Sequence, residues 1–152
     1  MTQISFYILK NAQQIPELFA CQLIHKAWRK GLPVHVHTED KEACDKLDTL
    51  LWQWREDSFI PHEISNTQQS ATTSQQHAVS TPVTLGYDNL PEHFTGLVIN
   101  LTDQPIQTFN NYSRVCEMVA QGLNDKEILK ISRKKFRFYQ GKGVQPETFE
   151  IV

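Results

Sequence analysis

The chain has 152 residues, a formal net charge of −2 at pH 7 and 21% charged residues. This length suits one domain around one core, so we expect residues 1–152 to form a single domain. The near-neutral charge excludes the strongly basic class of nucleic-acid-binding proteins, and any anion-binding surface must come from a local concentration of charge. No apolar run reaches the ~20 residues that span a membrane, and the N-terminus lacks a signal-peptide pattern. We therefore expect a cytoplasmic protein.

Apolar periodicity predicts two strand–helix units in the first third of the chain. Alternating or continuous β-forming residues indicate the strands, and apolar residues at helical spacing indicate the helices. Gly31 ends the first helix, as a C-terminal glycine should. Acidic residues open the second helix, where the helix dipole favours them. The four predicted elements are a strand at 3–9, a helix at about 16–31, a strand at 33–38 and a helix from about 38 to 52 or 54.

The remainder of the chain predicts further strands, two helices and one long polar segment. Residues 66–80 are dominated by Gln, Ser, Thr and Asn, and we expect a flexible loop there inside the single domain. The run G-L-V-I-N-L at 96–101 predicts a strand buried on both faces. The other predicted elements are an extended piece at 58–62, a possible strand at 82–86, a helix at about 107–121, a helix at about 124–140 and a tail whose Phe149 and Ile151 pack back on the domain.

This order of elements determines the predicted fold class. Strands alternate with helices through most of the chain, and such alternation is typical of a sheet covered by helices on both sides. We therefore predict an α/β protein: a single three-layer, Rossmann-like domain with a mostly parallel central sheet flanked by helices.

The patterns that accompany catalysis are missing from the sequence. Where a dinucleotide-binding fold places its glycines, the chain has K-N-A-Q-Q at 10–14, and no phosphate-binding G-x-x-x-x-G-K-[ST] loop occurs. His35 and His37 lie on one side of a predicted strand, but two ligands are too few for a metal site. The three cysteines are dispersed, which argues against disulfides and zinc. We expect no cofactor, no metal and no catalytic residue.

The most conspicuous pattern is the basic segment Lys126–Lys142, which contains seven Lys or Arg residues and one acidic residue. Asn124 and Glu127 at its start form a capping-box pattern, with Asn124 as the N-cap. Cationic residues spaced by three or four stack along one face of a helix. Arginine recognises carboxylates in a bidentate manner, and Phe136 borders the cationic face. The face consists of Lys126, Lys130, Arg133 and Arg137.

A second group of aromatic residues lies between the end of the second helix and the following extended piece. It contains Trp52, Trp54 and Phe59, and is followed by Pro61 and His62. Packing in the core is the ordinary fate of such side chains. An exposed pair of Trp52 and Phe59 would instead make an anchor for a partner protein, because Trp is enriched at binding hot spots.

At these two groups the sequence resembles the chi subunit of bacterial DNA polymerase III, an accessory protein of the clamp loader. The resemblance covers nearly the whole chain and rests on the order and spacing of short motifs. These motifs are F-Y-I-L at 6–9, A-W-R-K-G at 27–31, E-D at 39–40, L-D-x-x-L-W at 47–52, S-F-I-P-H at 58–62, P-V at 82–83, V-I-N-L at 98–101 and the basic last helix.

The resemblance implies a non-catalytic adaptor of DNA replication. Chi binds the psi subunit, and it also binds the acidic, Phe-ended C-terminal tail of the single-stranded-DNA-binding protein. The psi-binding surface would include Trp52 and Phe59. Lys134 and Lys135 would be solvated or steering charges. The tail-binding residues would be Arg133, Phe136, Arg137, Val119 and Thr148; the family usually has Tyr and Lys at the second and third of these positions.

Two other readings of the sequence stay open. The basic helix also fits a direct single-stranded nucleic-acid-binding module, because phosphates attract Lys and Arg while bases stack on aromatic rings. In the adaptor reading, DNA is contacted mainly through the partner. A nucleotide-dependent enzyme on the predicted sheet is the third reading, and the missing glycine loop argues against it.

Overall fold

The structure is a computed structural model that describes residues 2–54, 60–64 and 83–151. Its helices are α1 (Pro16–Arg29), α2 (Lys41–Gln53) and α4 (Lys126–Gly141), with short 3-10 turns η1 (Phe109–Asn111) and η2 (Gln121–Leu123). Among the described residues, no helix combines the length and the apolar character that a membrane crossing requires. The predicted loop at 66–80 and the pair Ser58–Phe59 lie outside the described residues.

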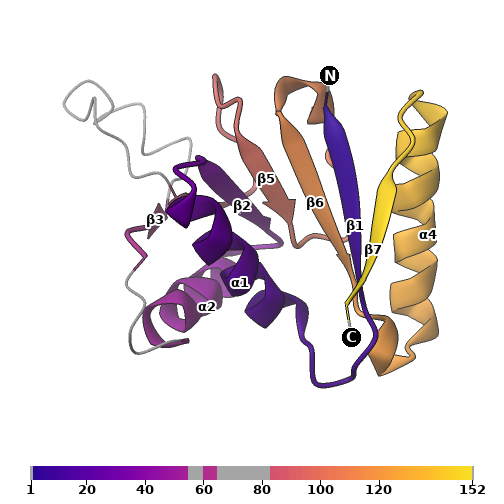
Figure 1. The fold of residues 1–152 in the computed structure, drawn as a ribbon, viewed down its shortest axis with the longest axis horizontal. Coiled ribbons are helices and arrows are strands. Elements are labelled where there is room, and N and C mark those ends of the chain that lie inside the picture. The colour runs from indigo at the N-terminus through magenta and orange to yellow at the C-terminus, as the bar shows by residue number, and fades with distance from the viewer. Residues whose placement is uncertain (1, 55–59, 65–82, 152) are drawn as a thin grey trace.

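A seven-stranded, wholly parallel sheet forms the centre of the molecule, in the order β3-β4-β2-β5-β6-β1-β7. Figure 1 shows the first and last strands of the chain, β1 and β7, side by side at one end of this sheet. The strands are β1 (Gln3–Leu9), β2 (Val34–Thr38), β3 (Glu63–Ile64), β4 (Val83–Tyr87), β5 (Leu97–Asn100), β6 (Arg114–Val119) and β7 (Glu147–Ile151).

Helices cover both faces of the sheet, and each covering makes its own apolar core (Figure 1). On one face, residues of α1 and α2 such as Ile24 and Leu47 pack against β2, β4 and β5. On the other face, Tyr139 and Phe136 of α4 pack with Phe6 of β1. The prediction of a three-layer α/β fold around a parallel sheet is therefore confirmed.

The predicted helix at 107–121 was wrong. Only the turn η1 is helical there, and residues 114–119 form β6 in the middle of the sheet. Val115 and Val119 face α4, whereas Cys116 and Met118 face α1 and α2. A separation of four residues satisfies both a helical period and a strand period of two, so these two valines fitted either structure. The short and nearly continuous apolar run V-C-E-M-V was the better signal, because such runs are typical of a parallel strand that is buried on both faces.

The C-terminal tail forms the edge strand β7 and packs on the domain, as predicted. Its backbone pairs with β1, and the ring of Phe149 stacks on Tyr7 with centroids 5.3 Å apart. Lys10 and Glu150 add an ion pair of 2.5 Å at the end of this pairing. β7 thus closes one end of the sheet beside α4 (Figure 1).

Candidate partner-binding surfaces

The basic segment forms α4 with a different start from the one predicted. Asn124 was expected to cap the helix, but it has a φ of 52° and ends the turn η2. Asp125 is the N-cap instead: its carboxylate accepts a hydrogen bond of 2.9 Å from the backbone N–H of Glu127. A negative side chain also suits this end of the helix dipole. The helix therefore begins one residue later, without changing which residues share a face.

The four cationic residues expected to share a face of α4 are all exposed: Lys126, Lys130, Arg133 and Arg137. Phe136 is half-buried, and its ring lies 5.2 Å from the ring of Phe6 on β1. One part of that ring thus packs on the sheet, while another part is exposed at the border of the face that carries the two arginines. A carboxylate that bound Arg133 or Arg137 would therefore lie next to an aromatic surface.

The other two expected tail-binding residues lie on the same face of the sheet as α4. Val119, at the end of β6, packs in the cluster that contains Phe136. Thr148 is exposed on β7 and is the register partner of Phe6. Partners in a parallel sheet direct their side chains to the same side, so Thr148 belongs to the α4 side. The fold thus brings residues from β6, α4 and β7 to one side of the sheet.

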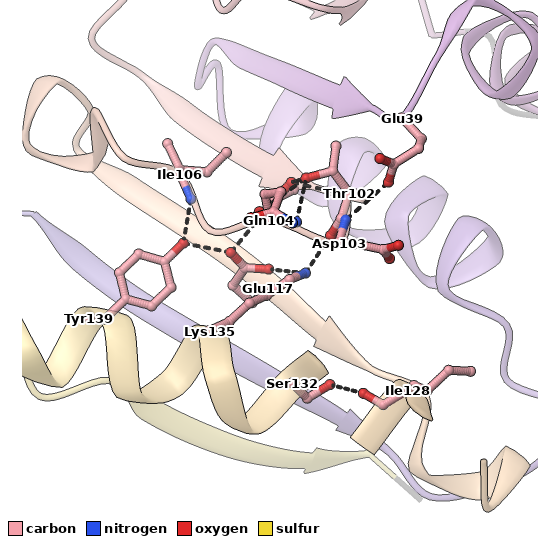
Figure 2. Close-up of polar contacts among 11 residues, drawn as sticks. Glu39, Thr102, Asp103, Gln104, Ile106, Glu117, Ile128, Ser132, Lys135 and Tyr139 are labelled. Atoms are coloured by element: carbon pink, nitrogen blue, oxygen red, sulfur yellow. Dashed lines mark hydrogen bonds and ion pairs between the residues drawn. The ribbon is translucent and has the colours of Figure 1, made fainter. Parts of the chain in front are cut away.

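Lys135 was expected to be a solvated charge, and this was wrong. Its side chain is buried, and its ammonium lies 3.0 Å from Oε1 of Glu117 on β6. Tyr139, one turn further along α4, donates a hydrogen bond of 2.6 Å to Oε2 of the same carboxylate. Figure 2 shows both side chains reaching from α4 to Glu117. The inward side of α4 is thus held to the sheet by a buried ion pair as well as by apolar contacts.

The loop after β5 completes this buried polar cluster. Asn100 donates a hydrogen bond of 2.8 Å to Oε2 of Glu117. Lys135 also donates to the carbonyl of Thr102 (Figure 2). Burial raises the pKa of Glu117, and the Lys135 ammonium and the three hydrogen bonds to the carboxylate oppose that rise. We define Asn100, Thr102, Glu117, Lys135 and Tyr139 as the buried polar cluster.

Trp52 lies on the opposite face of the sheet, at the end of α2, and 47% of its surface is exposed. Its ring stacks on the buried His62, with centroids 4.4 Å apart. His62 is itself fixed at both ring nitrogens: Nδ1 donates to the carbonyl of Ile60 at 2.7 Å, and Nε2 lies 2.9 Å from Oδ1 of Asp48. Trp52 is therefore an exposed aromatic side chain on a rigid support. Phe59, its expected companion, lies outside the described residues.

The histidines on β2 are two polar side chains within the sheet. His35 is buried, and its Nδ1 lies 2.8 Å from the hydroxyl of Thr84 on β4. Burial lowers the pKa of His35 to about 3, and it also lowers that of His37, so both rings are neutral at pH 7. Within residues 2–54, 60–64 and 83–151, no three His, Cys, Asp or Glu side chains gather as a metal site would require.

The three cysteines are free and buried. Burial raises the pKa of the Cys21 and Cys116 thiols to about 12 and raises that of Cys44 as well. A thiol reacts as its thiolate, so these side chains are poor nucleophiles at neutral pH. They contribute packing to the core that α1 and α2 form with the sheet.

Comparison with known proteins decides the family. The model of the family described as DNA polymerase III chi subunit, HolC, matches residues 1–147. The chain belongs to the DNA polymerase III chi subunit family. Its relatives include the DNA polymerase III subunit chi of Pseudomonas aeruginosa, 35% identical over 94% of this chain and 92% of that protein. The subunit chi of Haemophilus influenzae is 28% identical over 96% of this chain and 95% of that protein.

The fold of this chi-family chain also occurs in larger proteins. A crystal structure of T4 UvsW superposes with a TM-score of 0.66 over 99% of this chain, at 9% sequence identity. The chain spans 42% of that structure. At this identity the similarity concerns the fold alone.

The buried polar cluster was missed by sequence reasoning. Glu117 is the one charged residue inside the apolar run V-C-E-M-V, and Asn100 ends the apolar run of β5. Charged residues are seldom fully buried unless they are paired. An isolated Glu in an apolar strand was therefore the available signal, and the error over 107–121 concealed it.

Proposed function

We propose that this chi-family chain is a non-catalytic accessory subunit of the DNA polymerase III holoenzyme. In this role it connects the clamp loader, through psi, to the C-terminal tail of the single-stranded-DNA-binding protein. The observation that carries the proposal is the arrangement on α4, where the half-buried ring of Phe136 borders the face that carries exposed Arg133 and Arg137. An acidic tail that ends in Phe offers both a carboxylate for the arginines and a ring for the aromatic surface.

The expected binding mode is weak and dependent on salt. A disordered tail must become ordered when it binds, which limits its affinity to about the micromolar range. Local positive charge on α4 attracts the acidic tail, and dissolved ions screen this attraction over ~10 Å at 0.1 M salt. Arg133 and Arg137 act on the tail directly, and Thr148 on β7 and Val119 on β6 lie on the same side of the sheet.

Replacement of both arginines, Arg133→Ala with Arg137→Ala, should abolish measurable binding of an acidic Phe-ended peptide in isothermal titration calorimetry. Charged hydrogen bonds contribute ~1.5–3 kcal/mol each, so losing two lowers a micromolar affinity by at least about a hundredfold. The matched control removes two exposed charges from α2, as Lys41→Ala with Lys46→Ala. Undiminished binding in the α4 variant, with an intact thermal transition, would refute the tail site.

The exposed side chain of Trp52 leads to a prediction about the binding of psi. Trp52→Ala should weaken the complex with psi by about tenfold or more in analytical ultracentrifugation, because exposed Trp side chains on rigid supports are typical hot spots. The same variant should bind the tail peptide normally, since Trp52 and α4 lie on opposite faces of the sheet. An unchanged psi complex would exclude Trp52 from this interface and leave the α4 assignment standing.

A further inference from the structure

A second cationic surface lies at the C-terminal end of α1, far from α4 in sequence and on the opposite face of the sheet (Figure 1). Lys26, Arg29 and Lys30 are exposed there and line a surface depression together with Gln22, His25 and Trp54. We call these six residues the α1 basic groove. Gln22, His25, Lys26 and Arg29 follow helical spacing, so they form one continuous face of α1.

The cations of this groove differ from the two exposed lysines of α2, which are paired with carboxylates. On α2, Lys41 lies 2.8 Å from Asp45 and Lys46 lies 3.3 Å from Glu42. Within the described ranges 2–54, 60–64 and 83–151, no carboxylate lies within ion-pair distance of the three groove cations. Among the residues that the structure describes, none of those lining the depression is acidic. A chain with a net charge of −2 therefore holds a local positive patch here.

Aromatic rings complete the groove. Trp54, at the end of α2, is half-buried, and its ring lies 5.9 Å from the ring of His25, nearly perpendicular to it. The centre of the Trp28 ring lies 6.4 Å from that of the His25 ring. The tryptophans pack against the core below, so the rings are supported from beneath. Cations beside a fixed aromatic platform are the combination that proteins use for single-stranded nucleic acids, with phosphates on Lys and Arg and bases on the rings.

We propose that the α1 basic groove binds single-stranded nucleic acid directly, with Lys26, Arg29 and Lys30 on the phosphates and Trp54 under a base. An acidic peptide would engage only the cations of the groove, whereas the described lining residues also offer the aromatic ring of Trp54. A base has a flat face for the indole and polar edges for Gln22 and His25. This function goes beyond tail binding and does not depend on it.

The test is fluorescence anisotropy with a labelled oligothymidylate at several salt concentrations. Lys26→Glu with Arg29→Glu should weaken binding at least about tenfold and reduce the slope of log K against log salt by about 1.4, since each neutralised phosphate contributes about 0.7. The control with the same charge change is Lys41→Glu with Lys46→Glu on α2, which should keep most of the affinity. Equal loss in the two variants would show a general charge effect and overturn the site.

Trp54 provides an independent readout. Trp54→Leu should lower affinity about tenfold, and Trp54→Phe should restore most of it, because a stacking platform needs a ring. A melting curve for each variant separates this effect from loss of the fold. Full affinity in a folded Trp54→Leu variant would overturn the stacking assignment. Two further results would overturn the proposal. Binding that requires Arg133 and Arg137 instead would place the nucleic acid on α4. Competition by polyglutamate as strong as by unlabelled oligonucleotide would indicate an acidic protein partner.

Discussion

Lys135→Met should destabilise the protein by about 3–5 kcal/mol at neutral pH, which is the usual cost of removing one partner from a buried ion pair. Methionine keeps most of the apolar stem of lysine and removes the ammonium. The Glu117 carboxylate would then stay fully buried with two neutral donors, Tyr139 and Asn100. The neighbouring substitution Lys134→Met is the matched control, since Lys134 is exposed on the same helix. Urea unfolding of the two variants measures the difference.

A double variant tests whether the loss comes from the uncompensated charge. In Glu117→Gln with Lys135→Met, the amide oxygen can still accept the hydrogen bonds that Tyr139 and Asn100 now donate to Oε2. The charge is gone, so most of the lost stability should return, within about 1–2 kcal/mol of the original protein. A double variant as unstable as Lys135→Met would show that the ammonium contributes through Thr102 or through packing instead.

The pH dependence of Lys135→Met follows from the pKa of Glu117. Burial already raises this pKa, and the lysine that lowers it would be absent. The folded state then binds its proton more tightly than the unfolded state, whose Glu pKa is about 4.3. The destabilisation should therefore be small below that pH and grow as pH rises through the folded-state pKa. A deficit that stays constant between about pH 4 and pH 8 would contradict this account.

Sequence patterns predicted most of the strands, because a parallel strand that is buried on both faces has a short run of apolar residues. β1 and β5 were found in this way, and β2 was found by its alternation. β6 was missed because Phe109 and Tyr112, which belong to η1 and the loop after it, extended an accidental helical pattern. With β6 misread, the neighbour of β1 in the sheet could not be identified. Strand order depends on such long-range contacts, which no local pattern contains.

For the charged surfaces too, local sequence patterns predicted some features, and long-range contacts determine the others. Exposure of Arg133 and Arg137 followed from helical spacing, which is local. Burial of Lys135 depends on Glu117, which lies 18 residues earlier on another element. The α1 basic groove was missed for a similar reason: Trp54 of α2 comes next to His25 of α1 only after both helices pack on the sheet. Composition and spacing therefore identified one charged face and missed the other.

Gly122→Ala should destabilise the protein by about 3 kcal/mol, at the upper end of the usual cost of overpacking. Gly122 lies in η2, the turn that connects β6 to α4, and a Cβ there would lie 2.5 Å from the backbone nitrogen of Ala12 and 2.6 Å from the carbonyl oxygen of Asn11. Both obstacles are backbone atoms of the loop after β1. That loop cannot yield easily, because the Asn11 carbonyl accepts a hydrogen bond of 2.9 Å from Gln14.

Gly141 supplies the control for this substitution. It ends α4, and a Cβ there would meet nothing within 4 Å. Gly141→Ala should leave stability unchanged or raise it by up to about 1 kcal/mol, because alanine favours the helix. Urea unfolding of both variants isolates the steric effect from the chemical change, which is identical. If Gly122→Ala were as stable as Gly141→Ala, the loop after β1 would have to move away from η2. The close approach of Gly122 to the backbone of Asn11 and Ala12 would then not fix the position of the turn before α4.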